Sequence, residues 1–335
     1  MFNSVPIDSL PLPVMLVSLD HKVMAANSKA KSIFANVKTG RPITDIFSSD
    51  DLLALCTQVA ETGKAGDCEL VRKKPSKRRF QVHIGPFANE ETRGMFLAFY
   101  ETTAAREAER MRSSFVADVS HELRSPLTTM IATIETLKGS AGDKPEVRGR
   151  FIDLMADETN RMHRIVDDLL SLSATEALVH VPPEDSVNLA PIVESVAEVL
   201  LLKAENKNME LKLKLESDLP DILGKKDELY QMVYNLADNA IKYGPENSTV
   251  TLGVKSRGDD VILKTRNFGE PIRKKHIPRL TERFYRVDKS RSRDLGGTGL
   301  GLAIVKHIMN RHMGVMEITS GAKKGTVFSV RFPKK

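Results

Sequence analysis

The sequence contains no tryptophan, and aromatic side chains make up only 5% of its 335 residues. Few aromatic side chains argue against a nucleic-acid site built on base stacking. Cysteine is also scarce, since Cys56 and Cys68 are the only two. Two cysteines are too few for a disulfide framework or a cysteine metal site, and the seven histidines other than His121 lack metal-ligand spacing. We therefore expect both cysteines to pack as small hydrophobic residues.

Long hydrophobic runs are absent too. No run of 18 apolar residues exists, and the segment 10–19 is interrupted by Pro11 and Pro13. Such a segment is too short for a membrane-spanning helix, and the first residues lack the regions of a signal peptide. The sequence therefore predicts a cytoplasmic chain, with peripheral association with the inner membrane or a membrane segment outside this sequence left open.

The charge balance is mildly basic. Lys and Arg number 50 against 44 Asp and Glu, which gives a formal charge of +6. This balance suits an anionic ligand such as a nucleotide and does not favour direct contact with nucleic acid. Apolar residues make up 41%, enough for two or three packed domains. The basic cluster at 72–79 is typical of a solvated hairpin turn, with contact to anionic lipid or an acidic partner as the alternative.

Residues 5–101 are predicted to form a small α+β unit. Five segments are rich in strand-forming residues, and Phe80, Val82 and Ile84 alternate with the period of two that one buried sheet face requires. The predicted strands are 14–19, 23–27, 68–72, 79–84 and 94–100, and the predicted short helices are 28–35 and 50–62.

Residues 103–181 change to two long amphipathic helices. Apolar residues recur at three, four or seven along each helix, and Gly139, Gly142 and Pro145 separate the two. The second helix ends before Pro182. Two antiparallel helices cannot bury such wide apolar stripes alone. We therefore predict a homodimer in which two helical hairpins form a four-helix bundle.

Residues 182–335 alternate between helix and strand, which predicts an α/β sandwich with one helical layer. The predicted helices include 189–204 and 227–242, and the predicted strands are 211–215, 250–255, 261–265, 315–319 and 326–332.

A histidine within the first long helix carries the first candidate chemistry. His121 lies off the apolar stripe, so its ring should reach solvent. Imidazole is largely neutral near pH 7, as a nucleophile must be, and Glu122 is a neighbouring proton acceptor or orienting group. Pro126 lacks the N–H that would bond the Glu122 carbonyl, so a bend is expected one turn after His121. Taken alone, this histidine is better explained by a solvated surface position than by catalysis.

The segment 115–127 resembles the phosphoacceptor box of histidine kinases, H-E-x-x-[ST]-P-L. The resemblance implies that His121 accepts the γ-phosphoryl group of ATP and that Glu122 assists. Many members have Thr or Asn at the position of Ser125, where the side chain helps to dephosphorylate the partner protein. Ser125 keeps a hydroxyl group, so the resemblance leaves a phosphatase activity open.

Three polar residues of a later predicted helix share one face. Asn235, Asn239 and Lys242 lie at i, i+4 and i+7 among apolar neighbours, which a merely solvated face does not explain. Asparagine carbonyls suit Mg²⁺, and a lysine suits phosphate. The segment 231–243 resembles the N-box of the same kinases. The resemblance implies that Asn239 binds Mg²⁺, that Asn235 and Lys242 contact phosphates, and that Tyr243 lies near the adenine.

Four glycines within 296–301 would let backbone N–H groups approach an anion, and a predicted helix follows directly. The run G-G-T-G-L-G-L-A-I-V resembles the second glycine box of this superfamily. The segment 282–288 resembles its F-box, which implies a mobile lid at 288–296 over the nucleotide. The implied nucleotide-binding residues here are Arg286, Gly297, Thr298, Gly299, Leu300 and Gly301.

The first glycine box departs from the family pattern D-x-G-x-G. Asn267 replaces the aspartate that accepts a hydrogen bond from adenine, Gly269 remains, and Pro271 replaces the second glycine. Two interpretations follow. Either ATP binding persists, weakened by about 1–3 kcal/mol for the altered hydrogen bond, or the kinase is degenerate and the protein works as a phosphatase or scaffold.

Taken together, residues 103–332 resemble sensor histidine kinases of two-component systems, most closely the phosphate-regulon sensor kinases, and residues 5–101 resemble a PAS domain. The resemblance implies a PAS-like sensor at 1–102, a dimerisation and histidine phosphotransfer domain at 103–181 and a GHKL (Bergerat) ATP-binding domain at 182–335. It also implies autophosphorylation with ATP and Mg²⁺, followed by transfer to an aspartate of a response regulator. A GHKL-type ATPase, which would not need His121, is the alternative.

Overall fold

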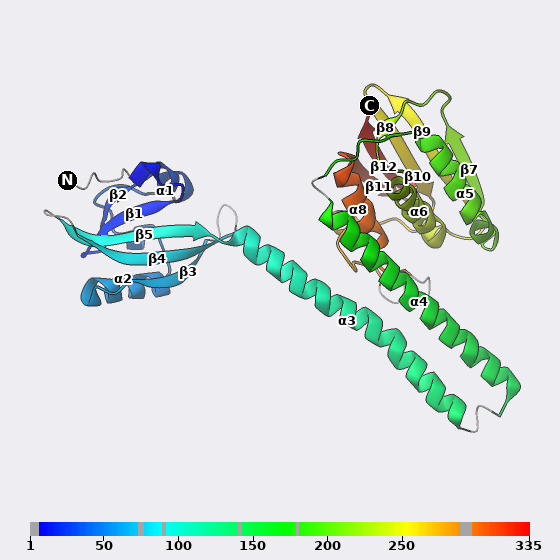
Figure 1. Cartoon of the computed structure of the whole chain (residues 1–335), viewed down its shortest axis with the longest axis horizontal. Coiled ribbons are helices and arrows are strands. Elements are labelled where there is room, and N and C mark those ends of the chain that lie inside the picture. The colour runs from blue at the N-terminus through cyan, green and yellow to red at the C-terminus, as the bar shows by residue number, and fades with distance from the viewer. Residues whose placement is uncertain (1–6, 73–76, 89–91, 140–142, 179–180, 289–296) are drawn as a thin grey trace. The chain divides into compact units, whose positions relative to one another are not determined.

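The computed structural model describes residues 7–72, 77–88, 92–139, 143–178, 181–288 and 297–335. The chain divides into two compact units, residues 1–116 and 117–335 (Figure 1). Within the described residues, no helix is both long and apolar enough to cross a membrane.

The first unit is a five-stranded antiparallel sheet in the order β2-β1-β5-β4-β3, with α2 packed on one face. This architecture confirms the predicted α+β fold of the unit. The bounds of most strands differ from the predicted bounds by a few residues. The strands are β1 (Val14–Ser18), β2 (Val23–Ala26), β3 (Gly66–Arg72), β4 (Arg78–Ala88) and β5 (Arg93–Glu101), and the helices are α1 (Ser28–Ile33) and α2 (Asp50–Thr62).

The core of the first unit lies between the sheet and its helices. Phe80, Val82 and Ile84 are each fully buried, as their alternation predicted. Cys56 is also fully buried, and burial raises the pKa of its thiol to about 12. A thiol that stays protonated is unreactive, so Cys56 packs as a small hydrophobic side chain.

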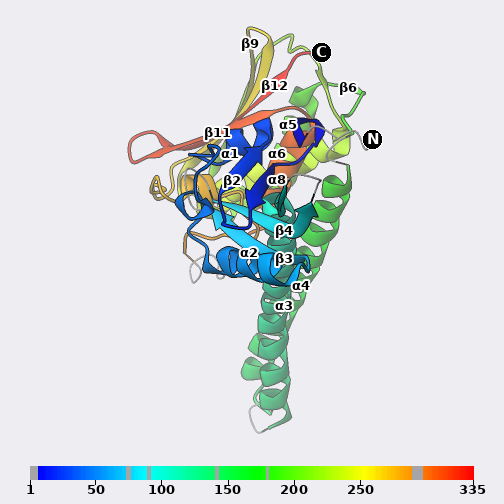
Figure 2. The ribbon, with the colours of Figure 1, turned by 90° about the vertical axis from the view of Figure 1, so that its left-hand side faces the viewer.

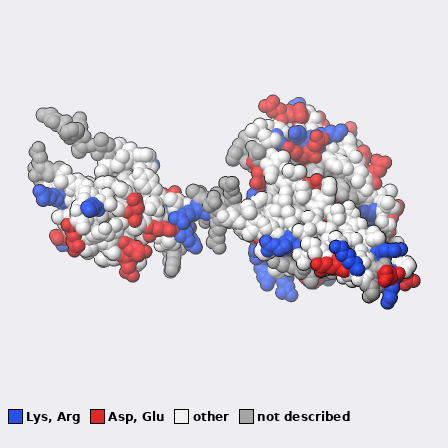
Figure 3. All heavy atoms as spheres, turned by 60° about the horizontal axis from the view of Figure 1, so that its bottom comes forward, with Lys and Arg blue, Asp and Glu red and all other residues white. Residues whose placement is uncertain are grey.

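The basic cluster falls at the turn between β3 and β4, and its members 73–76 lie outside the described residues. Arg79 forms an ion pair of 2.5 Å with Glu69, and Arg78 lies 3.6 Å from Glu101. These ion pairs neutralise part of the cluster within its own sheet, which favours the hairpin interpretation. On the face of the molecule in Figure 3, acidic and basic side chains are interspersed.

The second unit begins with a helical hairpin. α3 (Thr103–Lys138) and α4 (Pro145–Ala177) lie side by side in Figures 1 and 2, and Thr159 of α4 contacts Met130 of α3. Pro145 is the first residue of α4, a position that tolerates the missing N–H of proline. Several large apolar side chains of the pair remain more than 40% exposed. They include Leu127, Ile131, Ile134, Ile152, Val166 and Leu170.

The rest of the second unit is built on a mixed five-stranded sheet in the order β11-β12-β10-β9-β7. Only β7 and β9 run parallel, and α5, α6 and α8 cover one face, so the predicted sandwich with one helical layer is confirmed (Figure 1). The elements are α5 (Leu189–Glu205), β7 (Glu210–Leu215), α6 (Lys226–Tyr243), β9 (Thr249–Arg257), β10 (Asp260–Asn267), α8 (Gly301–Arg311), β11 (Val315–Gly321) and β12 (Gly325–Pro333). The sequence patterns missed the short pair β6 (Ser186–Val187) and β8 (Ile222–Leu223).

His312, at the end of α8, connects that helix to the start of α6. Its ring is buried, its Nδ1 lies 2.8 Å from the carbonyl of Ile308, and its Nε2 accepts a hydrogen bond of 3.0 Å from the N–H of Lys225, the residue that caps α6. Burial lowers the pKa of His312 below its ordinary value. The ring is therefore neutral, with Nδ1 as the donor and Nε2 as the acceptor.

Candidate active site

A pocket of about 710 Å³ opens beside α6. Its lining comes from α4, α5 and α6, from β10 and β12, from the segment 270–288, and from the glycine run at the start of α8. Convergence of so many elements on one polar concavity marks the default ligand site of the second unit.

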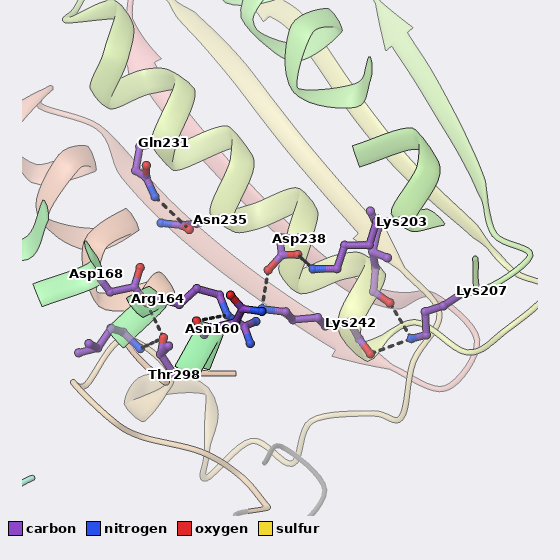
Figure 4. A network of polar contacts seen from close by, with 12 residues as sticks. Asn160, Arg164, Asp168, Lys203, Lys207, Gln231, Asn235, Asp238, Lys242 and Thr298 are labelled. Atoms are coloured by element: carbon purple, nitrogen blue, oxygen red, sulfur yellow. Dashed lines mark hydrogen bonds and ion pairs between the residues drawn. The ribbon is translucent and has the colours of Figure 1, made fainter. Parts of the chain in front are cut away.

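Asn235, Asn239 and Lys242 all line this pocket, as their helical spacing predicted. Asn235 Oδ1 accepts a hydrogen bond of 3.4 Å from Gln231 (Figure 4). Asn235 Nδ2 is buried and has no hydrogen-bond partner among the described residues. An orphaned amide donor at this point fits a bound acceptor such as a phosphate oxygen or a water held by a metal ion.

Two lysines converge on Asp238, one helical turn before Lys242 (Figure 4). Lys242 Nζ lies 2.6 Å from one carboxylate oxygen of Asp238, and Lys203 of α5 pairs with the other. Burial alone would raise the pKa of Asp238, but the two ammonium groups outweigh it and hold the pKa below its ordinary value. The lysines thereby place positive charge at the rim of the pocket in fixed positions.

The glycine run depends on glycine at one position above all. Gly299 has φ of +77°, and a Cβ there would lie 2.9 Å from the backbone of Phe284. Phe284 N donates a hydrogen bond of 2.9 Å to Gly299 O, so the run is tied to the segment before it. Gly301 then begins α8, directly beside Asn235. The N-terminus of an eleven-residue helix thus faces the pocket, where it favours an anion.

The altered first glycine box also contributes to the pocket, through Asn267 and Pro271. Asn267 is 4% exposed at the end of β10, opposite Thr326 on β12. A Cβ on Gly269 would collide with the backbone carbonyl of Tyr243, so this glycine is required. Pro271 is exposed and lines the pocket. Gly269, where packing leaves no room for a side chain, is therefore retained. The family glycine that is missing corresponds to Pro271, which is exposed.

Tyr243 and Arg286 also line the pocket. Tyr285, which follows Phe284, forms a hydrogen bond of 2.6 Å between its hydroxyl and Nδ1 of His276. The guanidinium of Arg279 lies 4.2 Å from the ring centroid of Tyr285. These contacts order the segment before the predicted lid. Of the lid, Asp288 lines the pocket, and 289–296 lie outside the described residues.

Helix α4 contributes two residues that the sequence analysis missed, Arg164 and Asp168. Thr298 of the glycine run donates a hydrogen bond of 2.6 Å to Asp168 (Figure 4). Burial raises the pKa of Asp168, and the bond from Thr298 opposes that effect in part. One signal was present, because Asp168 lies three residues after the buried Ile165 and four before the buried Leu172. A carboxylate on a buried helical stripe needs a partner.

A second set of contacts joins the end of α4 to the sandwich. Glu176 pairs with Arg283, and His307 Nε2 of α8 lies 3.1 Å from Glu176. Burial lowers the pKa of His307, and Glu176 opposes that effect. The ion pair between Glu176 and Arg283, the contact of Glu176 with His307 and the bond at Asp168 hold the C-terminal half of α4 against the glycine run and α8.

His121 is exposed, as its position off the apolar stripe predicted. It does not line the pocket beside α6. With Ser125 it lines a separate open groove of about 700 Å³ along α3. Glu122 points elsewhere, because its Oε2 accepts a hydrogen bond of 2.9 Å from Arg161 of α4. The helix continues through Pro126 to Lys138.

No group of three or more His, Cys, Asp or Glu side chains that could hold a metal ion occurs in the parts of the chain that the structure describes. A cation at the pocket would therefore rely on an amide oxygen, phosphate and water, which is the donor set that Mg²⁺ accepts.

Two family matches fall mainly in the second unit. Residues 111–178 match the His Kinase A (phospho-acceptor) domain, and residues 224–335 match the histidine kinase-, DNA gyrase B- and HSP90-like ATPases.

Curated relatives extend the likeness to almost the whole chain. The sensor-like histidine kinase SenX3 of Mycobacterium tuberculosis is 33% identical over 329 residues, covering 97% of this chain and 78% of SenX3. SenX3 of Mycolicibacterium smegmatis is 30% identical, and the match covers 83% of its length. The phosphate regulon sensor protein PhoR of Pseudomonas aeruginosa is 35% identical over 254 residues, but the chain spans only 56% of PhoR.

Solved structures show the same fold. Histidine kinase ThkA, in a crystal structure with the response regulator protein TrrA, aligns with 100% of this chain at a TM-score of 0.54 and 21% identity. Acinetobacter baumannii histidine kinase AdeS aligns with 64% of the chain at a TM-score of 0.53 and 20% identity.

Proposed function

Given that this chain belongs to the sensor histidine kinases of two-component systems, we propose that it transfers the γ-phosphoryl group of ATP to His121 and then to an aspartate of a response regulator. The observation that supports this best is that one chain has an exposed histidine within a phosphoacceptor box and a polar pocket with paired asparagines and a glycine run. The pocket alone would not favour a kinase over a simple ATPase, which would not need His121.

We assign the pocket to ATP and Mg²⁺. The orphaned amide of Asn235, the two lysines near Asp238 and the start of α8 fit the phosphates and their cation. Bound Mg²⁺ would neutralise phosphate charge, with Asn239 as its protein ligand. The proposed nucleotide contacts are Asn235, Lys242, Tyr243, Asn267, Gly269, Arg286, Gly297, Thr298, Gly299, Leu300 and Gly301.

The proposed reaction relies on positioning and charge neutralisation. A neutral ring nitrogen of His121 attacks the γ-phosphorus, the N–P bond forms, and the bond to the bridging oxygen of the β-phosphate breaks so that ADP leaves. The proton on the other ring nitrogen passes to water, because the Glu122 carboxylate is held by Arg161 of α4. An aspartate carboxylate of the response regulator then attacks the same phosphorus, the N–P bond breaks, and the ring takes a proton back from water so that His121 leaves as a neutral imidazole. Ser125, exposed beside His121, is the residue for a partner-directed phosphatase step.

The altered first glycine box is compatible with this function. Gly269, which alone fits against the backbone of Tyr243, is retained, and Asn267 still supplies a buried carbonyl acceptor. We therefore propose that ATP binding persists in weakened form, by about 1–3 kcal/mol for the altered hydrogen bond.

We also propose a homodimer, joined through the helical hairpins. The exposed apolar side chains of α3 and α4 are the expected contact surface, because two helices leave them open to water. In this proposal 1–102 is the sensor, 103–181 the dimerisation and phosphotransfer domain, and 182–335 the catalytic domain. The response regulator would dock at the open groove beside His121. A cytoplasmic location is proposed because ATP and response regulators are present there.

The deciding experiment incubates the chain with γ-labelled ATP and Mg²⁺. We expect an acid-labile, alkali-stable label that is absent from His121→Ala, while ATP affinity measured by calorimetry is the same for both proteins. ATP hydrolysis without label would instead support a GHKL-type ATPase. If the chain neither binds nor hydrolyses ATP, that result would support the degenerate scaffold and contradict the proposal.

A further inference from the structure

An arginine lies on the buried stripe of α4, next to the phosphoacceptor turn. Arg161 occupies the position one turn before Ile165, and only 9% of its side chain is exposed. Arginine is rarely buried unless its charge is paired, because removing the guanidinium from water is costly. Its environment should therefore show what the charge is for.

Two carboxylates face this guanidinium. Glu122 Oε2 lies 2.9 Å from Arg161 Nη2, and Glu158 Oε2 lies 3.8 Å from Nη1. The side chains of Glu122 and Glu158 are themselves only 28% and 19% exposed. Buried charges interact more strongly than exposed ones, so this cluster is not an ordinary surface ion pair.

The geometry separates the two carboxylates. The bond to Glu122 has the length of a charge-assisted hydrogen bond, whereas the distance to Glu158 is too long for one. Glu122 directly follows His121 on α3 and lies 39 residues from Arg161 in sequence. Arg161 therefore reaches across the hairpin to the one carboxylate adjacent to the phosphoacceptor.

We propose that Arg161 is a positioning residue of the phosphoacceptor box, which holds the Glu122 carboxylate against α4 and neutralises its charge. This proposal rests on the proposed kinase function. ATP carries several negative charges to His121, and an uncompensated carboxylate beside the ring repels it. Arg161 does not line the nucleotide pocket, so it acts on the transfer step and not on nucleotide binding.

The same buried arginine could instead serve packing alone, because its long apolar stem covers hydrophobic surface. The two roles make different demands. A packing role needs the stem of Arg161 and is indifferent to the charge on Glu122. A positioning role needs the positive charge and disappears when Glu122 is neutral. A double-mutant cycle between the two residues separates them.

The experiment uses the full chain and the variants Arg161→Met, Arg161→Lys, Glu122→Gln and the double variant Arg161→Met with Glu122→Gln. Arg150→Met, which changes an exposed arginine of the same helix, is the matched control. Labelling rate at saturating ATP, ATP affinity by calorimetry and the dimeric state are measured for each. The protonation of the His121 ring is followed by NMR across pH without nucleotide.

We expect Arg161→Met to slow labelling at least tenfold while ATP affinity stays within twofold of the unchanged protein. In the Glu122→Gln background the same change should slow labelling less than threefold. Arg161→Lys keeps the charge and should retain most of the rate. The titration midpoint of His121 should rise by about half a pH unit in Arg161→Met, because the bare carboxylate favours the imidazolium, and not in the double variant.

A rate for Arg161→Met equal to that of Arg150→Met overturns the proposal, as does an equal loss in both backgrounds. If Arg161→Met does not fold, Arg161→Lys decides the question, and a tenfold loss there contradicts charge neutralisation. If the unchanged chain takes up no label, the kinase function fails, and the NMR titration still tests the Glu122–Arg161 coupling by itself.

Discussion

The groove beside His121 and the pocket beside α6 belong to one unit but are built in different ways. The groove is lined by α3 and by one residue of α4, Phe151, and the histidine in it is exposed to water. The pocket is lined by four helices, two strands and two connecting segments, and the charges of Lys203, Asp238 and Lys242 are paired there. The pocket is thus preorganised, whereas reaction at the groove depends on what approaches it. Changes at the pocket should therefore alter nucleotide affinity in a graded way, without altering the groove.

The largest effect at the pocket is expected from Gly299→Ala. The positive φ and the backbone of Phe284 leave no room for a Cβ, so the glycine run must shift away from the phosphates. We expect a loss of about 2 kcal/mol in ATP binding, or roughly thirtyfold, from backbone strain of this kind. Calorimetry measures it, and Gly258→Ala in the exposed β9–β10 turn, also at positive φ, is the control. Unchanged affinity would mean that the run does not hold the phosphates.

The next effect is a gain from Asn267→Asp. A carboxylate forms a stronger hydrogen bond to a base amino group than an amide does, and Asn267 is buried where such a bond is protected from water. We expect ATP affinity to rise by about 1 kcal/mol, or roughly fivefold. Labelling at low ATP should rise in parallel, and labelling at saturating ATP should not. A loss of affinity would show that the pocket has adapted to the amide.

Lowering the pH should destabilise the sandwich more than the helical hairpin. His312 has a lowered pKa through burial, so its contribution is fully present above the ordinary pKa of histidine, about 6.5, and is lost as pH falls toward the folded value. Protonation also removes the acceptor for Lys225 N–H. We expect the sandwich to lose about 1 kcal/mol of its free energy of unfolding between pH 7 and 5.

Chemical denaturation at several pH values measures this loss, with tyrosine signals of the sandwich as the probe. His312→Gln should flatten the pH dependence at a lower overall stability. An unchanged slope in that variant would assign the acid sensitivity to another group, such as His307.

The smallest effect is expected from Asp168→Asn. The Asp168 carboxylate accepts a hydrogen bond from the Thr298 hydroxyl in the part of the pocket where we place the phosphates, so it competes with an anionic ligand for that donor. Removing the charge while keeping the shape should raise ATP affinity about threefold, as expected for a partly screened charge at this rim. Asp167→Asn, an exposed neighbour on α4, is the control. Weaker binding in Asp168→Asn would show that the carboxylate helps to bind the nucleotide.

The polar face of α6 was predictable because its three residues are local in sequence, and helical geometry alone brings them together. The strands of both sheets followed from the same local periodicity. The contacts of Arg161 and Asp168 were not predictable from such patterns. Hydrophobic periodicity registers only apolar residues, and the partners of these two charges lie 39 and 130 residues away. The ion pair between Lys203 and Asp238 was missed for the same reason. Charged residues on a buried stripe therefore signal that a partner exists but not which one.

The bond between Thr298 and Asp168 also makes two equilibria interdependent. If a bound nucleotide accepts a hydrogen bond from the Thr298 hydroxyl in place of Asp168, the contact between α4 and the glycine run is weakened. The free energy lost from that contact equals the free energy by which the contact had opposed nucleotide binding. Any stimulus that loosens the helix must then tighten ATP binding by an equal factor. Nucleotide binding and release of α4 from the glycine run would therefore favour each other.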